Sequence, residues 1–130
     1  MSAESIRLSE KAKTQLITLK RRTGIQHWNV LCRWAFCVSL SEPSSPPYET
    51  IPNDSNVEMT WKTFAGSRQS VYWALLKERA CQDGHELTDA QLLLVLRLHI
   101  HRGIAYLLNK PSLGDLLKSA AEPSDKQINV

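Results

Sequence analysis

The sequence lacks long apolar runs: no stretch of about 18 uncharged apolar residues occurs, so no membrane-spanning helix is predicted. Its first residues, MSAESIRLSEKAK, contain no apolar signal-peptide segment, and we expect a mature start and a cytoplasmic protein. Cysteine is scarce as well. Cys32, Cys37 and Cys81 are odd in number and have neither framework nor metal spacing, which argues against a disulfide-stapled module and a zinc finger.

Catalytic motifs are also absent from the sequence. We find no phosphate-binding loop, nucleophile elbow, zinc-protease helix or dinucleotide fingerprint. His99 and His101 are two residues apart, so on a helix they point about 200° from each other and cannot share a metal ion. We therefore expect a protein that is not an enzyme and needs no cofactor or metal.

The residues that are present predict one mainly α-helical domain over residues 1–130. Hydrophobic residues make up 42% of the chain, enough for a core. Residues 5–9 alternate in polarity and predict a short strand, and Ser9 is suited to cap a helix that ends at Gly24. A second helix is expected over residues 26–40, where apolar residues cover more than one side.

The middle of the chain predicts a long loop and a small β element around residues 48–62. Residues 41–56 contain four of the six prolines, and residues 57–62 alternate as a strand does. A short extended piece at 48–51 would form a hairpin with that strand. A third helix is expected from residue 66 or 67 to about residue 82.

The C-terminal part, residues 66–121, is expected to hold copies of the chain together. Thr88 opens a predicted helix over residues 89–109 that is apolar on nearly every face. A small domain covers such a helix on about two sides, so self-association through this helix and the second one is the simplest remedy. A last short helix over 112–121 and a disordered tail over 122–130 complete the prediction. The tryptophans all lie in apolar patterns and are expected to pack in the core.

Positive charge is concentrated at the N-terminal end. Residues 1–40 hold seven bases against two acids, whereas the other ninety residues hold nine bases against eleven acids. Clustered bases bind the phosphates of nucleic acids and release their counterions. The expected DNA contacts lie on the first helix: Lys11, Lys13, Lys20, Arg21 and Arg22.

Two alternatives remain open from the residues alone. In the first alternative, the protein is a transcriptional regulator, because the strand–helix–helix order of residues 5–40 is similar to that of ribbon-helix-helix DNA binders. In the other, Cys32 or Cys37 carries sulfur as part of an enzyme. Trp28, Trp34 and Phe36 argue against the second, because apolar surroundings raise a thiol pKa and lower its reactivity.

Three segments resemble one known family. The run IRLSEKAKTQLITLKRRTGIQHWNVLCRWAFCVSL (residues 6–40), GSRQSVYWALLKERA (66–80) and LLLVLRLHIHRGIAYL (92–107) resemble the DNA sulfur modification protein family DndE. The resemblance implies work in bacterial DNA phosphorothioation, in which sulfur replaces a non-bridging oxygen of the DNA backbone. It also implies partner proteins: a cysteine desulfurase and an iron–sulfur protein that mobilise the sulfur, and an ATPase.

For this chain, the resemblance implies a homotetramer that binds duplex DNA, preferably nicked, through surface lysines. Carried over to this sequence, the candidate contacts are the same five bases of the first helix. The resemblance also agrees with the absence of catalytic motifs, because DndE is the small component of its system without an evident active site.

Overall fold

Two short strands that lie far apart in the chain pair with each other. The computed structural model describes residues 5–109, in which β1 (Ser5–Arg7) and β2 (Glu58–Thr60) form an antiparallel pair with Ile6 opposite Met59. Both of these side chains are buried. The expected hairpin of residues 48–51 with 57–62 is wrong, because β2 pairs with β1 and residues 48–54 contain no strand. The Ser55 hydroxyl helps to hold the pair, since it donates to the Leu8 carbonyl at 2.6 Å.

The strand–helix–helix order of the opening is confirmed, but its strand has a partner in the same chain. A ribbon-helix-helix protein pairs this strand with the strand of a second copy. Here β2 occupies one edge of β1, and Arg97 Nε donates to the Arg7 carbonyl at 3.0 Å. One edge of β1 and the Arg7 carbonyl are therefore already used within the chain.

Helix α1 (Glu10–Thr23) begins and ends where local chemistry predicts. The Ser9 Oγ accepts a hydrogen bond from the Ala12 N–H at 3.1 Å, and Gly24 ends the helix at φ 75°. This left-handed conformation is readily adopted by glycine. Helix α2 (Trp28–Ser41) follows after a short turn and buries residues on several sides, as expected.

The expected strand over residues 57–62 is shorter than predicted. Thr60 accepts the Thr63 N–H at its side-chain oxygen and so caps a short helix, α3 (Trp61–Ala65). A 3₁₀ turn, η1 (Gly66–Arg68), then leads into α4 (Gln69–Gln82). Trp61 is buried and stacks near Phe64, with ring centroids 5.5 Å apart. The other three tryptophans are half-buried and pack against the same core.

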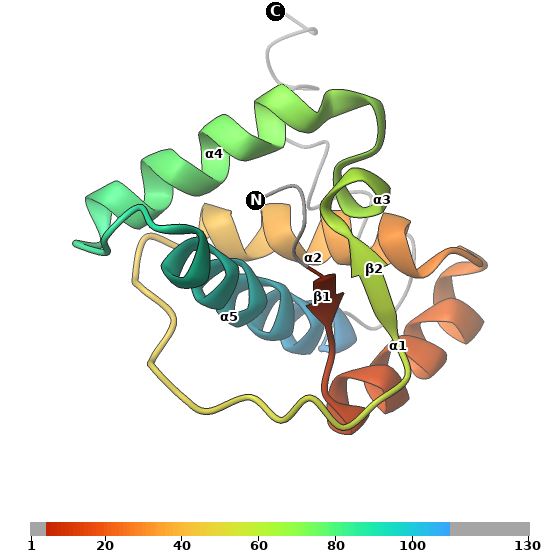
Figure 1. Cartoon of the computed structure of the whole chain (residues 1–130). Coiled ribbons are helices and arrows are strands. Elements are labelled where there is room, and N and C mark those ends of the chain that lie inside the picture. Colours follow the sequence, from red (N-terminus) through yellow and green to blue (C-terminus); the bar gives the residue numbers. More distant parts are fainter. Residues whose placement is uncertain (1–4, 110–130) are drawn as a thin grey trace, which may run out of the picture.

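Helix α5 (Asp89–Leu108) is capped by Thr88 as predicted and crosses the centre of the molecule beside α2 (Figure 1). Leu96, Ile100 and Ile104 are completely buried, and no residue from 91 to 108 is exposed. One chain therefore covers much of the surface of this helix, although residues such as Leu93 and Tyr106 are only half-buried. Helix α2 is covered as well, apart from Cys37 and Ser41. The expected self-association through α2 and α5 stays a prediction.

The proline-rich segment covers one side of α5. It leaves the end of α2 and runs along the outside of the molecule to β2 (Figure 1). Arg97 donates to the Ile51 and Pro52 carbonyls at 3.2 Å, and Arg102 donates to the Ser44 carbonyl at 2.9 Å. The helix expected at 112–121 and the tail expected at 122–130 lie outside the described residues.

Candidate nucleic-acid interface

The buried stripe of α1 determines which of its side chains reach the surface. Ala12, Leu16 and Leu19 pack into the core with at most 2% of their surface exposed. They are spaced four and three residues apart, so they form one face of the helix. The five predicted DNA contacts must therefore lie on the remaining circumference.

The five bases divide into two rows and one ridge residue. At about 100° per residue, Lys13 and Lys20 lie about 20° apart, and so do Lys11 and Arg22. The two pairs point to nearly opposite flanks of α1, on either side of the buried stripe. Arg21 lies between the rows and directly opposite the stripe. The structure thus brings the residues onto one helix, but not onto one face.

Two bases near the end of α1 also have structural contacts. Lys20 Nζ lies 3.6 Å above the centre of the Trp28 ring, a cation–π contact between α1 and α2. Arg22 Nη1 donates to the Leu108 carbonyl at 2.6 Å, where it satisfies one of the last carbonyls of α5. Arg21 is exposed. The sequence pattern gives no sign of either contact, because both depend on how α1 packs against another helix.

The beginning of α1 has acidic surroundings. Asp54 Oδ1 accepts the Glu10 N–H at 2.8 Å, so a carboxylate already occupies the positive end of the helix. Lys11 borders a cavity of about 410 Å³ that Glu49 and Asp54 also line, between the loop and α5. Near the far end of α1, by contrast, no acid of residues 5–109 forms an ion pair with Lys20 or Arg21.

Two further bases of the N-terminal part stabilise the fold. Arg7 donates to the Ser55 carbonyl at 2.8 Å and pairs with Glu58 at 2.6 Å. Arg33 Nη1 donates to the Phe64 carbonyl at 2.9 Å and so joins α2 to α3. The excess of positive charge over residues 1–40 thus overstates the charge available for a ligand.

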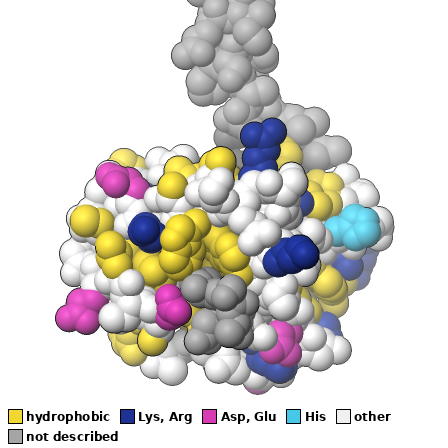
Figure 2. All heavy atoms as spheres, turned by 45° about the horizontal axis from the view of Figure 1, so that its top comes forward, with side chains coloured by type: hydrophobic (Ala, Val, Ile, Leu, Met, Phe, Trp, Pro, Cys, Tyr) yellow, Lys and Arg dark blue, Asp and Glu magenta, His cyan; other side chains and the backbone are white. Residues whose placement is uncertain are grey.

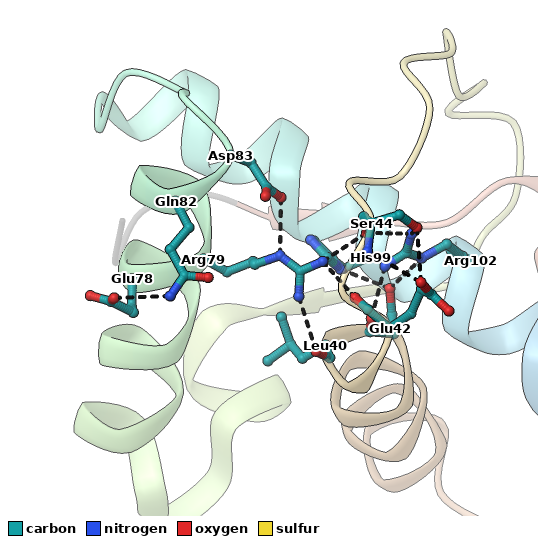
Figure 3. A network of polar contacts seen from close by, with 10 residues as sticks. Leu40, Glu42, Ser44, Glu78, Arg79, Gln82, Asp83, His99 and Arg102 are labelled. Atoms are coloured by element: carbon teal, nitrogen blue, oxygen red, sulfur yellow. Dashed lines mark hydrogen bonds and ion pairs between the residues drawn. The ribbon is translucent and has the colours of Figure 1, made fainter.

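A polar network joins the C-terminal ends of α2 and α4 to the interior of α5, and sequence reasoning missed it (Figure 3). Arg79 donates to the carbonyls of Leu40, Glu42 and Ser44 at 2.7 to 3.0 Å, and pairs with Asp83 at 3.1 Å. The four-residue spacing of Arg79 and Asp83 was the one sign of it in the sequence. The network fixes the start of the proline-rich segment.

The two histidines of α5 have structural contacts, as their spacing suggested. His101 Nε2 accepts the Ser9 N–H at 3.1 Å, and its Nδ1 lies 2.7 Å from the Arg97 carbonyl. Burial lowers the pKa of His101. His99 is fully buried, and its Nδ1 lies 2.7 Å from Ser39 Oγ. Burial and the nearby charges of Arg79 and Arg102 lower the pKa of His99 to about 4.

Cys32 and Cys37 differ in exposure, but the pKa of each thiol is raised. Cys32 is fully buried, and burial raises its pKa to about 12. Cys37 is exposed at its edge, yet burial of its thiol raises its pKa too. A raised pKa leaves less thiolate at neutral pH, so both thiols are weak nucleophiles.

The described residues show neither a metal cluster nor a spanning helix. Within residues 5–109, no three His, Cys, Asp or Glu side chains are placed to hold a metal ion. No helix of that part is long and apolar enough to cross a membrane.

Comparison with known proteins identifies the family. The sequence profile of the family described as DNA sulphur modification protein DndE matches residues 5–115. The chain belongs to the DndE family. The resemblance of the segments in residues 6–40, 66–80 and 92–107 to the DndE family is thereby confirmed, and no curated protein matches the chain.

Solved DndE structures share the fold. The crystal structure of DndE from Escherichia coli B7A, involved in DNA phosphorothioation modification, is 28% identical, with a TM-score of 0.68. The match covers 82% of this chain and 98% of that one. A DndE mutant involved in DNA phosphorothioation is 22% identical, with a TM-score of 0.62, and the match covers 82% of this chain and 99% of that one. At that identity the second match supports the fold alone.

Proposed function

We propose that the chain is a non-enzymatic DNA-binding component of the bacterial DNA phosphorothioation machinery and contacts the backbone of duplex DNA, preferably nicked, through α1. Membership of the DndE family and the 28% identical relative involved in DNA phosphorothioation modification support this function. The protein works in the cytoplasm beside the other DNA sulfur modification proteins, which supply the sulfur chemistry. It needs no cofactor.

The observation that carries the proposal is the charge of α1. Five bases and one acid lie on its 14 residues. Among the described residues, no acid forms an ion pair with Lys11, Lys13, Lys20 or Arg21. Each base that neutralises a phosphate releases counterions, which gives affinity for any DNA sequence.

The two basic flanks of α1 suit a duplex better than a flat anionic surface. A helix that lies along the major groove has a phosphate chain on either side. The Lys13–Lys20 row then contacts one chain, and the Lys11–Arg22 row contacts the other. These contacts position the protein but read no sequence, which agrees with a modification component and not with a regulator.

The nucleophile chemistry of the chain supports a non-enzymatic role. The thiols of Cys32 and Cys37 have raised pKa values, and the Ser39–His99 pair is completely buried. A nucleophile must reach its substrate, and these groups are either sealed in the core or largely protonated. Replacement of both cysteines by serine should leave DNA modification intact.

The decisive experiment compares two charge reversals of equal size. Lys13→Glu with Arg21→Glu removes one of the two lysines of one flank and the ridge residue of α1, and neither side chain forms a hydrogen bond or ion pair within residues 5–109. Lys62→Glu with Lys77→Glu is the matched control, because both lysines are exposed on α3 and α4. Binding to intact, nicked and single-stranded DNA is titrated at two salt concentrations.

We expect the α1 variant to lose affinity and the control to retain it. Loss of the Lys13 phosphate contact should reduce the slope of log affinity against log salt by about 0.9. Equal effects of the two variants would show that only net charge matters, and unchanged binding by the α1 variant would refute the proposal. Arg22 and Lys20 are kept, because their loss would also remove contacts to Leu108 and Trp28.

A further inference from the structure

The cavity of about 410 Å³ lies between three parts of the chain that are distant in sequence. The first turns of α1 and the second half of α5 form two of its sides, and the proline-rich segment forms the third. A volume of this size is typical of sites for small ligands. Figure 2 shows the face that carries α4, where hydrophobic side chains lie among charged ones; none of the residues lining the cavity belongs to α4.

Apolar side chains form much of the cavity wall. Ala12 of α1 and Leu98 and Ala105 of α5 line it, and Ile51 of the proline-rich segment lies opposite α1 and α5. In ligand sites an apolar wall supplies affinity, and a few polar groups fix the orientation of the ligand. The cavity is therefore suited to a ligand that carries a small aliphatic group.

Two polar side chains of the cavity are already used by the fold. His101 accepts the Ser9 N–H at Nε2, and its Nδ1 lies 2.7 Å from the Arg97 carbonyl. Arg102 donates from each of its three guanidinium nitrogens to the end of α2 and the segment that follows it. The polar groups that remain for a ligand lie on α1 and on the proline-rich segment.

The remaining charges have opposite signs on two sides of the cavity. Lys11 stands on α1 and Glu49 on the proline-rich segment, and neither forms a hydrogen bond or ion pair within residues 5–109. Asp54 adds a second carboxylate on the side of Glu49. Burial lowers the pKa of His101, and Glu49 is close enough to oppose that shift, so its charge acts on the interior. A ligand with charges of both signs complements this arrangement.

The backbone of the proline-rich segment is unpaired beside the cavity. Residues 45–50 make no hydrogen bond within residues 5–109, although the carbonyls of Ser44 and Ile51 on either side accept from arginines of α5. Each of residues 48–50 keeps an amide N–H and a carbonyl for a partner. Extended peptides bind proteins by pairing with exposed backbone groups of this kind.

We propose that the cavity binds a short extended peptide that has a free ammonium group at one end and a free carboxylate at the other. The apolar wall takes a small aliphatic side chain, and the backbone of residues 48–50 bonds the peptide amides. Glu49 binds the ammonium group, and Lys11 binds the carboxylate. Nucleic acid does not fit this site, because Glu49 and Asp54 repel phosphate.

The site goes beyond the proposed function but shares Lys11 with it. A peptide that binds Lys11 removes one of the proposed phosphate contacts of α1, so it should weaken DNA binding by the unchanged protein. In the variant Lys11→Gln, that phosphate contact is already absent. The effect of peptide on DNA affinity should therefore disappear in this variant.

The first test titrates the tripeptide Ala-Leu-Ala into the full chain, by calorimetry and by nitrogen-15 NMR. We expect saturable binding that shifts the amide signals of Gln15, Thr50 and Ala105, since these residues line the cavity. The acetylated peptide lacks the ammonium group and the amidated peptide lacks the carboxylate. Each should bind at least tenfold more weakly, and inorganic phosphate should shift none of these signals.

The second test changes the cavity itself. Glu49→Gln and Lys11→Gln should each weaken binding of Ala-Leu-Ala at least tenfold, because each removes one charge partner. Lys11→Glu with Glu49→Lys should restore binding, with the peptide reversed. Ala105→Leu should abolish it by filling the cavity. Ala74→Leu is the matched control, because Ala74 is exposed on α4, and it should leave the affinity unchanged.

The results separate the cavity from DNA binding. No binding of Ala-Leu-Ala, or equal binding of its blocked forms, would overturn the proposal, and so would undiminished binding by both Glu49→Gln and Ala105→Leu. Lys13→Glu with Arg21→Glu should bind the peptide as the unchanged protein does, because neither residue lines the cavity. Peptide binding by a protein that binds no DNA would refute the proposed function and leave the peptide site standing.

Discussion

Gly103 lies in the interior of α5, where helix propensity alone makes alanine the better residue by about 1 kcal/mol. In the folded chain, a Cβ at this position would lie 1.7 Å from the carbonyl oxygen of Ala35 and 2.3 Å from its carbonyl carbon. Both are backbone atoms of α2, so no side-chain rotation relieves the overlap. We expect Gly103→Ala to destabilise the protein although propensity favours it.

The size of the effect follows from the distance that the helices must move. An ordinary contact begins at 3.4 Å, so α2 and α5 must separate by more than 1 Å where they pack most extensively. Overpacking of a core costs about 1–3 kcal/mol and occasionally more. After the gain in propensity, the upper end of that range leaves a fall of about 2 kcal/mol in the free energy of unfolding, and of up to roughly 10 °C in the Tm.

The assay is urea unfolding followed by circular dichroism, with Ser70→Ala as the control for propensity at an exposed helix position. The control should change stability by less than about 0.5 kcal/mol. Adding Ala35→Gly to Gly103→Ala should not restore stability, because the carbonyl group of residue 35 remains in place. If Gly103→Ala unfolds at the same urea concentration as the unchanged protein, or at a higher one, the close approach of the two helix backbones is refuted.

Three further changes test other parts of the structure. Burial lowers the pKa of His99 from 6.5 to about 4, so the stability that the neutral imidazole contributes is fully present above pH 6.5 and is lost as the pH falls toward 4. The free energy of unfolding at pH 5 should be about 2 kcal/mol lower than at pH 8, and His99→Gln should flatten this difference. Arg79→Met should lower the free energy of unfolding by about 3 kcal/mol, since it leaves three carbonyls and Asp83 without their partner. It should also speed proteolysis between residues 42 and 52, and an unchanged cleavage rate would contradict the role of Arg79 in holding that segment. Arg22→Gln should cost about 1 kcal/mol through its lost bond to Leu108, whereas Arg21→Gln should be neutral in thermal unfolding.

Much of the helix plan could be read from the sequence because helix ends depend on nearby residues. Ser9 and Thr88 accept N–H groups only three residues away, and Gly24 ends α1 through its own backbone angle. The stripe of Ala12, Leu16 and Leu19 follows from helical periodicity alone. The same periodicity gives the angular positions of the five bases of α1.

The partners of those elements could not be predicted from the sequence, because they depend on how separate helices and strands pack against one another. Local alternation gives β2 as a strand but not its pairing with β1, which lies about fifty residues earlier. Nothing local shows that Lys20 lies over Trp28 or that Arg22 reaches Leu108. These contacts decide which bases of α1 also hold the fold.

The sequence by itself therefore determined the helices, their caps and a basic first helix, since these rest on contacts within a turn or two. Only the tertiary structure decided how much of the surface of each helix is exposed to solvent. Helix α5 is a strongly apolar segment, and α2 and the proline-rich loop cover much of it, while Val71 and Leu75 of the less apolar α4 remain exposed. Exposure depends on which elements meet in space, and hydrophobicity along the chain does not contain that information.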